Sequence, residues 1–286
     1  MPQLKPLVGT DYYLWKYVPS LAAAIIFVLL FGVITIAICW RMFRTRSWFC
    51  IPFALGGILE ILGYGYRIHA RSQTDKVVPY AIQNSGILLA PVFFAASIYM
   101  VLGRTIRAAG GERFSLIRPN WSTKIFVSGD VLSLMVQAGG AGMMVSSGNQ
   151  NLGQNMIIGG LFIQLIVFGF FIVGTAIFHT RMKRHRGPGL SGRGFVLWRK
   201  MVNMLYACSV LIVIRSVFRV IEYIMGSDAY LLSHEWTMYV FDAVLMWGVM
   251  AIFFVYFPAG LQPPKNDNES LDLGGHHLIS HRAQKP

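Results

Sequence analysis

Long apolar stretches alternate with short polar ones along almost the whole chain. A helix needs about 20 mostly apolar residues to cross a bilayer. The stretches that satisfy this are residues 18–40, 50–69, 80–103, 124–145, 155–178, 201–225 and 236–257. The pattern therefore predicts an all-α, polytopic membrane protein with seven transmembrane helices.

The same pattern divides the chain into three parts. Residues 18–257 are predicted to form the transmembrane domain, and residues 1–17 a polar and aromatic segment before it. Residues 258–286 are rich in Pro, Asn, Asp and Gly, which is typical of disordered segments. His276, His277 and His281 lie in this tail without rigid partners, so we interpret them as part of a flexible polar tail and expect no metal site.

Composition supports a membrane protein, and the distribution of charge predicts its orientation. The 286 residues are 55% hydrophobic and 13% charged, with a formal net charge of +13. The basic residues gather in short connections between apolar stretches, where they can contact anionic lipid head groups, so we expect no nucleic-acid partner. The first, third and fifth connections hold three, four and seven basic residues, against four on the other side. The positive-inside rule then predicts an extracellular N-terminus and a cytosolic C-terminus.

The sixth apolar stretch carries charges that hydrocarbon would reject. Arg215, Arg219 and Glu222 are spaced at i, i+4 and i+7, so on a helix they form one stripe. An arginine near the centre of a membrane helix costs roughly 2.5 to 3.5 kcal/mol on insertion scales. The stripe therefore needs partners from other helices or water.

Depth in the membrane predicts which charges meet, because a helix rises about 1.5 Å per residue. On this basis Glu60 pairs with Arg215, Arg219 with Asp242, and Arg67 with Glu222. These pairs would put the second, sixth and seventh helices side by side. The network would either line a polar cavity that opens outward or act only as an ion-pair lattice that fixes helix packing.

Asp130, in the fourth stretch, has no basic residue at its depth. Such a carboxyl group could carry a proton or dock a cation. Alternatively it is a neutral acid that hydrogen-bonds to Ser128, to Ser133 or to a neighbouring glutamine. Gln83, Gln137 and Gln164 also face inward and are typical of interhelical hydrogen bonds.

Two features predict how particular helices are built. Pro91 lies in the middle of the third stretch, where it should free a backbone carbonyl for a partner from a neighbouring helix or water. The run QAGGAG at residues 137–142 lies in the fourth stretch, where small residues allow helices to approach closely.

These residues together match the pattern of one protein family from the second helix onward. The matching residues, in chain order, are Glu60, Gly63, Tyr64 and Arg67; Tyr80, Gln83, Leu89, Ala90, Pro91, Ala95, Ala96, Tyr99, Leu102, Gly103 and Arg104; Asp130, Gln137, Gly139 and Gly140; Gly160, Leu161 and Gln164; and Arg215, Phe218, Arg219, Glu222, Gly226, Glu235, Tyr239 and Asp242. In this pattern the chain resembles the fungal RTA-like proteins, also called the lipid-translocating exporter family. It departs from the family at Ala141, which interrupts a glycine triplet, and at residues 257–259, where a His-Pro-Gly-like end is usual.

The resemblance implies a fungal membrane protein that exports sphingoid long-chain bases and related amphiphilic amines. Such export would give the cell resistance to stress or to toxins. The plasma membrane is the expected location, with an endomembrane as the alternative. The residues expected to line the substrate path are Glu60, Tyr64, Arg67, Gln83, Asp130, Gln137, Gln164, Arg215, Arg219, Glu222, Glu235, Tyr239 and Asp242. Membrane lipids or amphiphilic small molecules are the expected partners, and no cofactor is expected. Asp130 is the first candidate for a transported proton.

A receptor and an intramembrane enzyme are the alternatives to export. A seven-helix receptor for such lipids would use its Arg-rich cytosolic connections to recruit a cytosolic protein partner. An intramembrane zinc hydrolase needs several histidines around one cavity, whereas His69, His179 and His234 all fall at the edges of the apolar stretches. We therefore expect the chain not to be an enzyme.

Overall fold

The computed structural model describes residues 20–70, 77–115, 119–145, 150–184, 193–225, 235–259 and 261. Its long helices are α1 (Leu21–Thr45), α2 (Ile51–Ala70), α3 (Val77–Ala108), α4 (Pro119–Val145), α5 (Gln150–Arg184) and α6 (Arg193–Met225). A further rod combines α8 (Glu235–Met238), the π-helix η3 (Tyr239–Val244) and α9 (Leu245–Val255). Two short 3₁₀ helices, η1 (Trp48–Cys50) and η2 (Glu112–Phe114), lie in connections. The predicted N-terminal segment and most of the predicted tail lie outside the described residues.

Within the described ranges, seven helices are long and apolar enough to cross a membrane, as the sequence predicts. The chain is a multi-pass membrane protein. Several helices continue beyond the predicted apolar stretches: α5 ends at Arg184 rather than at residue 178, and α6 begins at Arg193 rather than at residue 201. Hydropathy marks only the part of a helix that lies in hydrocarbon, whereas the hydrogen-bonded backbone continues into the head-group region. Long basic side chains are favourable there because their charged ends reach water and lipid head groups.

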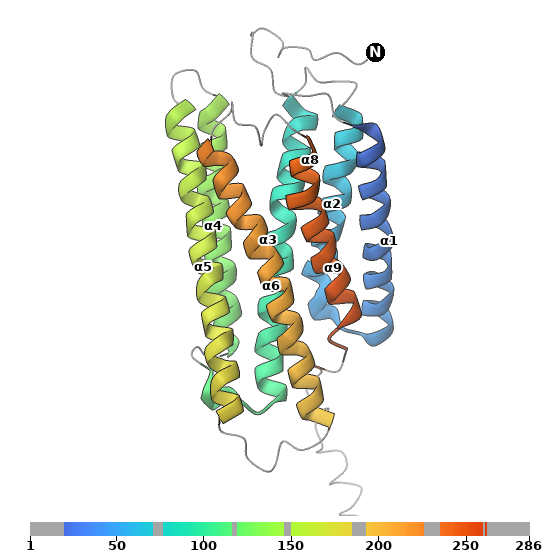
Figure 1. Cartoon of the computed structure of the whole chain (residues 1–286), viewed down its shortest axis with the longest axis vertical. Helices are drawn as coiled ribbons and strands as arrows, with labels where there is room; N and C mark the ends of the chain where they lie inside the picture. The colour runs from blue at the N-terminus through green and yellow to red at the C-terminus, as the bar shows by residue number, and fades with distance from the viewer. Residues whose placement is uncertain are drawn as a thin grey trace, which may run out of the picture.

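The helices form one elongated bundle (Figure 1). Neighbours in sequence pack as neighbours in space from α1 to α6, and α9 closes the arrangement by contacting both α6 and α1. Helix α3 also contacts α6, and it is the most buried of the spans, whereas α1, α4 and α5 expose much of their surface. Residues on α3 can therefore meet residues on α2, α4 and α6.

Glycines allow the closest helix contacts, as the QAGGAG run predicts. A Cβ added at Gly140 of α4 would lie 2.6 Å from the Gly153 carbonyl oxygen of α5. A Cβ at Gly86 of α3 would lie 2.9 Å from the Leu59 carbonyl oxygen of α2. Backbones that approach this closely leave no room for a side chain, so glycine fixes both helix pairs.

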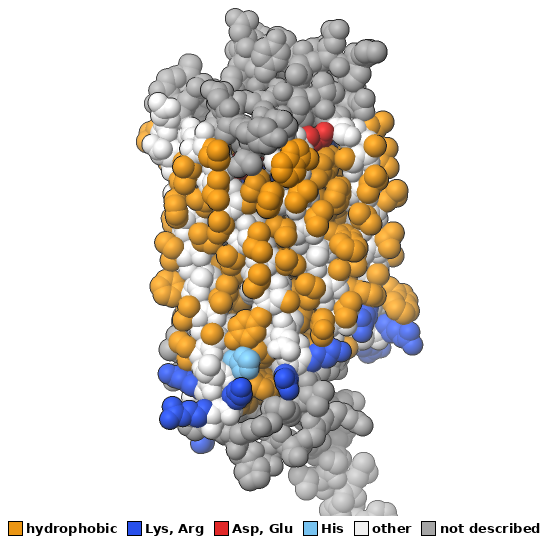
Figure 2. Space-filling view, viewed as in Figure 1, with side chains coloured by type: hydrophobic (Ala, Val, Ile, Leu, Met, Phe, Trp, Pro, Cys, Tyr) orange, Lys and Arg blue, Asp and Glu red, His pale blue; other side chains and the backbone are white. Residues whose placement is uncertain are grey.

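The surface shows a broad hydrophobic band bounded below by basic side chains (Figure 2). Exposed residues of the band include Val33, Ile36, Met135 and Phe170. We call the boundary the basic end of the bundle, defined by the exposed side chains Arg44, Arg107, Lys183, Arg199 and Lys200. The predicted placement of this end in the cytosol stays a prediction.

A buried charged cluster as the candidate functional site

Charged side chains from α2, α6, α8 and η3 meet inside the bundle. This charged cluster consists of Glu60, Arg67, Arg215, Arg219, Glu222, Glu235 and Asp242. Glu60, Arg67 and Asp242 are each only 1% exposed. Charged side chains of the second, sixth and seventh helices come together as predicted, but the three helices are not all neighbours: the described ion pairs link the seventh helix to α2 and to α6, while α3 packs between α2 and α6. That the cluster lines a polar cavity that opens outward stays a prediction.

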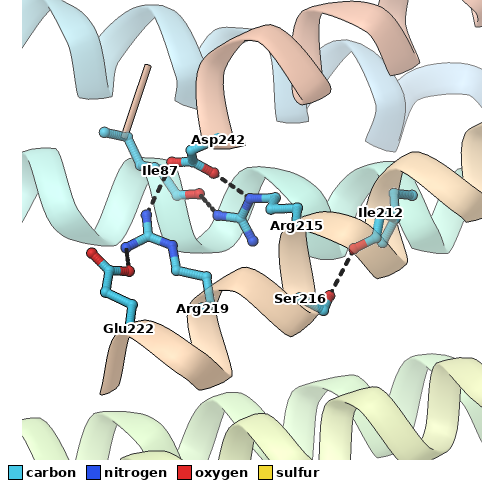
Figure 3. Close-up of polar contacts among 7 residues, drawn as sticks. All are labelled: Ile87, Ile212, Arg215, Ser216, Arg219, Glu222 and Asp242. Atoms are coloured by element: carbon cyan, nitrogen blue, oxygen red, sulfur yellow. Dashed lines mark hydrogen bonds and ion pairs between the residues drawn. The ribbon is translucent and has the colours of Figure 1, made fainter. Parts of the chain in front are cut away.

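Asp242 lies at the centre of the cluster and joins both arginines of the α6 stripe (Figure 3). Arg215 Nε donates to Asp242 Oδ1, and Arg219 Nη2 donates to Asp242 Oδ2 at 2.9 Å. Arg219 Nη1 also pairs with Glu222 Oε2 at 3.0 Å, one turn along the same helix. Both carboxylate oxygens of Asp242 are thus satisfied by charge-assisted hydrogen bonds.

Arg215 has a second partner, in the backbone of α3. Its Nη2 donates to the Ile87 carbonyl oxygen at 2.9 Å (Figure 3). Ile87 stands four residues before Pro91, which lacks the N–H that would otherwise bond this carbonyl. The prediction that Pro91 frees a carbonyl for a neighbouring helix is confirmed, and the donor is a buried guanidinium.

Arg67 forms the part of the cluster farthest from the basic end. Its Nη2 pairs with Glu235 Oε1 at 2.7 Å, and its Nε donates to the Tyr239 hydroxyl at 3.1 Å. The Ser20 backbone N–H, just before α1, donates to both Glu235 oxygens at 2.9 and 3.0 Å. Glu235 therefore ties the start of α1 and the end of α2 to the seventh span.

The π-helix η3 explains how one short segment contacts both Arg67 on α2 and the two arginines on α6. Tyr239 contacts Arg67 on α2, and Asp242 contacts the arginines on α6. The wider turn of a π-helix spreads two side chains three residues apart farther around the axis than an α-helix does. Such π-turns occur frequently at functional sites.

Glu60 is the exception in the cluster. Both of its carboxyl oxygens are buried without a hydrogen-bond partner among the described residues. The Tyr64 hydroxyl, one turn away on α2, and Gln83 Oε1 on α3 also lack partners there. Arg219 Nε, in the same cluster, is a fifth buried polar atom without a described partner. Buried polar groups are paired in the great majority of cases, so this concentration is unusual.

The predicted ion pairs are therefore partly right. The Arg219–Asp242 pair is confirmed. The Glu60–Arg215 pair is wrong, because Arg215 bonds Asp242 and Ile87 instead. The Arg67–Glu222 pair is also wrong: Arg67 pairs with Glu235, and Glu222 is satisfied on its own helix. Depth along a helix gives the level of a side chain but not its direction around the axis, and Glu235 lies just outside the predicted seventh span, residues 236–257.

The remaining predicted site residues lie elsewhere, between α3, α4 and α5. The Tyr99 hydroxyl donates to Asp130 Oδ2 at 2.9 Å, while Gln137 Nε2 bonds Gln164 Oε1 at 3.3 Å. Asp130 Oδ1 has no partner in the described ranges. Within those ranges, no hydrogen bond links these residues to the charged cluster, so the thirteen predicted residues fall into two separately bonded groups.

Asp130 has a different partner from those predicted. Ser133 Oγ bonds the backbone carbonyl of Asp130, and Ser128 Oγ bonds that of Ile125, so neither serine reaches the carboxyl group. Serine on a helix commonly bonds back to its own preceding turn. Tyr99 could have been found only by knowing that α3 faces α4 at this level.

A groove on the outside of the bundle is separate from both polar sites. It has a volume of about 740 Å³ and runs between α3 and α4 beside the start of α2. Its lining is mostly apolar and includes Pro52, Met100, Val127, Val131 and Met135, with Lys124 also present. No residue of the charged cluster lines it.

Fold and site together define a seven-helix membrane protein with a buried charged cluster. Residues 53–265 match the model of the family described as RTA1 like protein, and the chain belongs to this family. Among relatives from Saccharomyces cerevisiae, Protein RTA1 is 33% identical, covering 86% of this chain and 85% of the relative. Protoporphyrin uptake protein 1 is 34% identical, with 86% and 92% covered.

A further relative from the same species carries a transport function in its name. Sphingoid long-chain base transporter RSB1 is 27% identical, covering 86% of this chain and 73% of the relative. No solved structure matches the chain. The family that the sequence resembles is therefore confirmed, and the relatives associate it with membrane transport and lipids.

Proposed function

We propose that this protein translocates amphiphilic molecules across a membrane, with sphingoid long-chain bases or related amphiphilic amines as the substrate class. The plasma membrane is the proposed location, and resistance to such compounds the proposed benefit. The observation that carries the proposal is the charged cluster inside the bundle. Supporting it is the relationship to a protein named as a sphingoid long-chain base transporter.

The chemistry of the cluster suits an amine head group. Crossing hydrocarbon with a charge is costly, so a translocator must provide polar partners along the way. Glu222, Glu235 and Asp242 offer carboxylates that now bond arginines, and a protonated amine could replace those arginines as donor. The rings of Tyr64 and Tyr239 lie 6.0 Å apart and offer aromatic faces to a cation.

The apolar tail needs no partner beyond the lipid. The groove between α3 and α4 has the lining and volume to hold part of an alkyl chain. Its separation from the charged cluster means that head group and tail would follow different surfaces of the bundle. The proposed activity moves the substrate without changing its covalent structure, so the chain would not be an enzyme.

The test is lipid flux in vesicles that contain only the purified protein. We expect a labelled long-chain amine to cross these vesicles faster than protein-free ones and to be recovered chemically unchanged. Glu235→Gln should lower the rate about tenfold or more, because a hydrogen bond to a charged group contributes roughly 1.5–3 kcal/mol. Glu112→Gln makes the same change at an exposed carboxylate of η2 and should keep the rate.

Equal flux with and without protein would contradict translocation. Ligand-dependent binding of a cytosolic protein in the absence of flux would favour the receptor alternative. Mass-spectrometric detection of a converted substrate would instead indicate an enzyme.

The relationship to Protoporphyrin uptake protein 1 supports a second substrate candidate, a porphyrin. The carboxylates of a porphyrin would bind the arginines of the cluster rather than its acids. Measuring protoporphyrin flux in the same vesicles decides between a cationic amine and an anionic porphyrin as the substrate. Flux of the porphyrin alone would move the substrate assignment to an anionic amphiphile while leaving translocation intact.

A further inference from the structure

The charges of the cluster do not balance. It holds three arginines, Arg67, Arg215 and Arg219, and four acids, Glu60, Glu222, Glu235 and Asp242. Three of the acids form ion pairs with the three arginines. Glu60 is the acid that forms none in the part of the chain that the structure describes. The surplus of one carboxyl group therefore falls on Glu60.

The surroundings of Glu60 make an uncompensated charge there costly. The residue is 1% exposed, and neither carboxyl oxygen has a described hydrogen-bond partner. The charged and titratable groups that act on it are Asp242 on η3, Arg215 and Arg219 on α6, and Tyr64 on its own helix. Both arginines direct donors to Asp242 (Figure 3), and neither donates to Glu60. An ionised group buried without direct pairing is strongly disfavoured.

One bound proton removes the imbalance. With Glu60 neutral, three carboxylates face three guanidinium groups, and the cluster carries no net charge. A proton needs no cavity, which fits the close packing around Glu60. On α2 and the adjoining α3, the buried atoms that lack described partners are two oxygens of Glu60, the Tyr64 hydroxyl and Gln83 Oε1, all of which can accept a hydrogen bond. Acceptors in this number suit a ligand that brings donors, such as an ammonium group with its three N–H bonds.

We propose that Glu60 is the proton-exchange site of the bundle, where one proton is traded for the positive head group of the transported amphiphile. When the bundle opens, the O–H bond of Glu60 breaks and the proton passes to water. The carboxylate that remains accepts hydrogen bonds from the ammonium group, so the cluster stays neutral before and after the exchange. This inference rests on the proposed function, because it supplies the coupling between proton and substrate.

Asp130 is the weaker site for this role, although the sequence favours it. Its Oδ2 accepts a hydrogen bond from Tyr99, so it is partly satisfied. It lies between α3, α4 and α5, apart from the arginines, and its protonation does not change the charge balance of the cluster. The exchange requires an acid that shares its surroundings with the head-group partners, and Glu60 meets this condition.

The first experiment measures the proton itself. Infrared difference spectra of the purified protein in lipid nanodiscs should show a protonated carboxyl band that disappears when a long-chain alkylamine is added. Glu60→Gln should remove this change, whereas Asp130→Asn should leave it. If Asp130→Asn removes the change and Glu60→Gln leaves it, the exchange site is Asp130 and the inference is overturned.

The second experiment measures binding of the same alkylamine between about pH 5 and pH 7, where the amine itself stays charged. Proton and ammonium compete for one carboxyl group, so affinity should fall by up to about tenfold for each unit that the pH falls. In Glu60→Gln the affinity should be at least about tenfold weaker and independent of pH. Glu112→Gln, at an exposed position, should behave like the wild type.

The two experiments separate this inference from the proposed function. A carboxyl band that depends on Glu60 and responds to amine, in a protein without flux, would keep the exchange site and reject translocation. Flux with no carboxyl change in the wild type, or with pH-dependent binding preserved in Glu60→Gln, would keep translocation and reject the exchange site. Monodisperse elution and an unchanged helical circular dichroism spectrum establish that Glu60→Gln is folded.

Discussion

At the scale of single residues, partners decide what a buried charge does. Asp242 and Glu60 are both carboxylic acids with 1% exposure. Asp242 receives donors from two guanidinium groups, whereas Glu60 receives none from the described residues. The first is therefore suited to hold helices together, and the second to gain and lose a proton. Arg215 has the most demanding position, since it satisfies Asp242 and a backbone carbonyl at once.

Replacing Arg215 tests this account. Arg215→Gln should destabilise the protein by about 3–5 kcal/mol, because it leaves one Asp242 oxygen and the Ile87 carbonyl without their donor in a buried place. Arg199→Gln removes the same group from an exposed position on the same helix and should cost little. Denaturant unfolding in detergent micelles measures both. A loss below about 1 kcal/mol for Arg215→Gln would contradict the contacts described.

At the scale of helices, small local departures from a regular α-helix build the site. Pro91 frees the carbonyl that Arg215 uses, and the π-turn of η3 lets Tyr239 and Asp242 reach different helices. Between α4 and α5 the decisive feature is glycine, because Gly140 faces a backbone oxygen of α5. Helix pairs in membranes depend on such close packing, since lipid offers no hydrophobic driving force between them.

A pair of glycines on α4 tests the importance of close approach. Gly140→Ala should cost about 1–3 kcal/mol, because its Cβ would stand 2.6 Å from the Gly153 carbonyl and force the helices apart. Gly142→Ala is the matched control, since a Cβ there meets nothing within 4 Å. That change should be neutral or slightly stabilising, because alanine favours helix more than glycine does. Thermal unfolding in the same detergent compares them, and equal effects would refute the packing argument.

At the scale of the whole molecule, the bundle has two unlike ends. Exposed basic side chains define one end (Figure 2), and α8, which begins at Glu235, the partner of Arg67, lies toward the other (Figure 1). The charged cluster thus extends from the middle of the bundle toward the end that the positive-inside rule assigns to the outside. If this orientation holds, an amine reaching the cluster from within the membrane would leave toward the extracellular face.

Cysteine labelling tests the orientation. In a background with Cys39, Cys50 and Cys208 replaced by alanine, Asn151→Cys should react with a membrane-impermeant maleimide in intact cells. Lys183→Cys should react only after permeabilisation, because the basic end should face the cytosol. Both positions are exposed and lie at opposite ends of α5, so they form a matched pair. The reverse labelling pattern would invert the proposed orientation.

The sequence by itself determined the seven helices, the family and the sharing of charge among the second, sixth and seventh spans. The seven helices follow from the lengths of the apolar stretches, the family from the spacing of its motifs, and the shared charge from the cost of a charge in hydrocarbon. Each of these can be read from positions along the chain alone. Only the tertiary structure decided that Arg215 bonds Asp242 and Ile87, that Arg67 bonds Glu235, and that Glu60 lacks a described partner. The physical reason is that a partner depends on the rotation of each helix about its axis and on the π-turn of η3. Periodicity along a single helix does not fix these relations between helices.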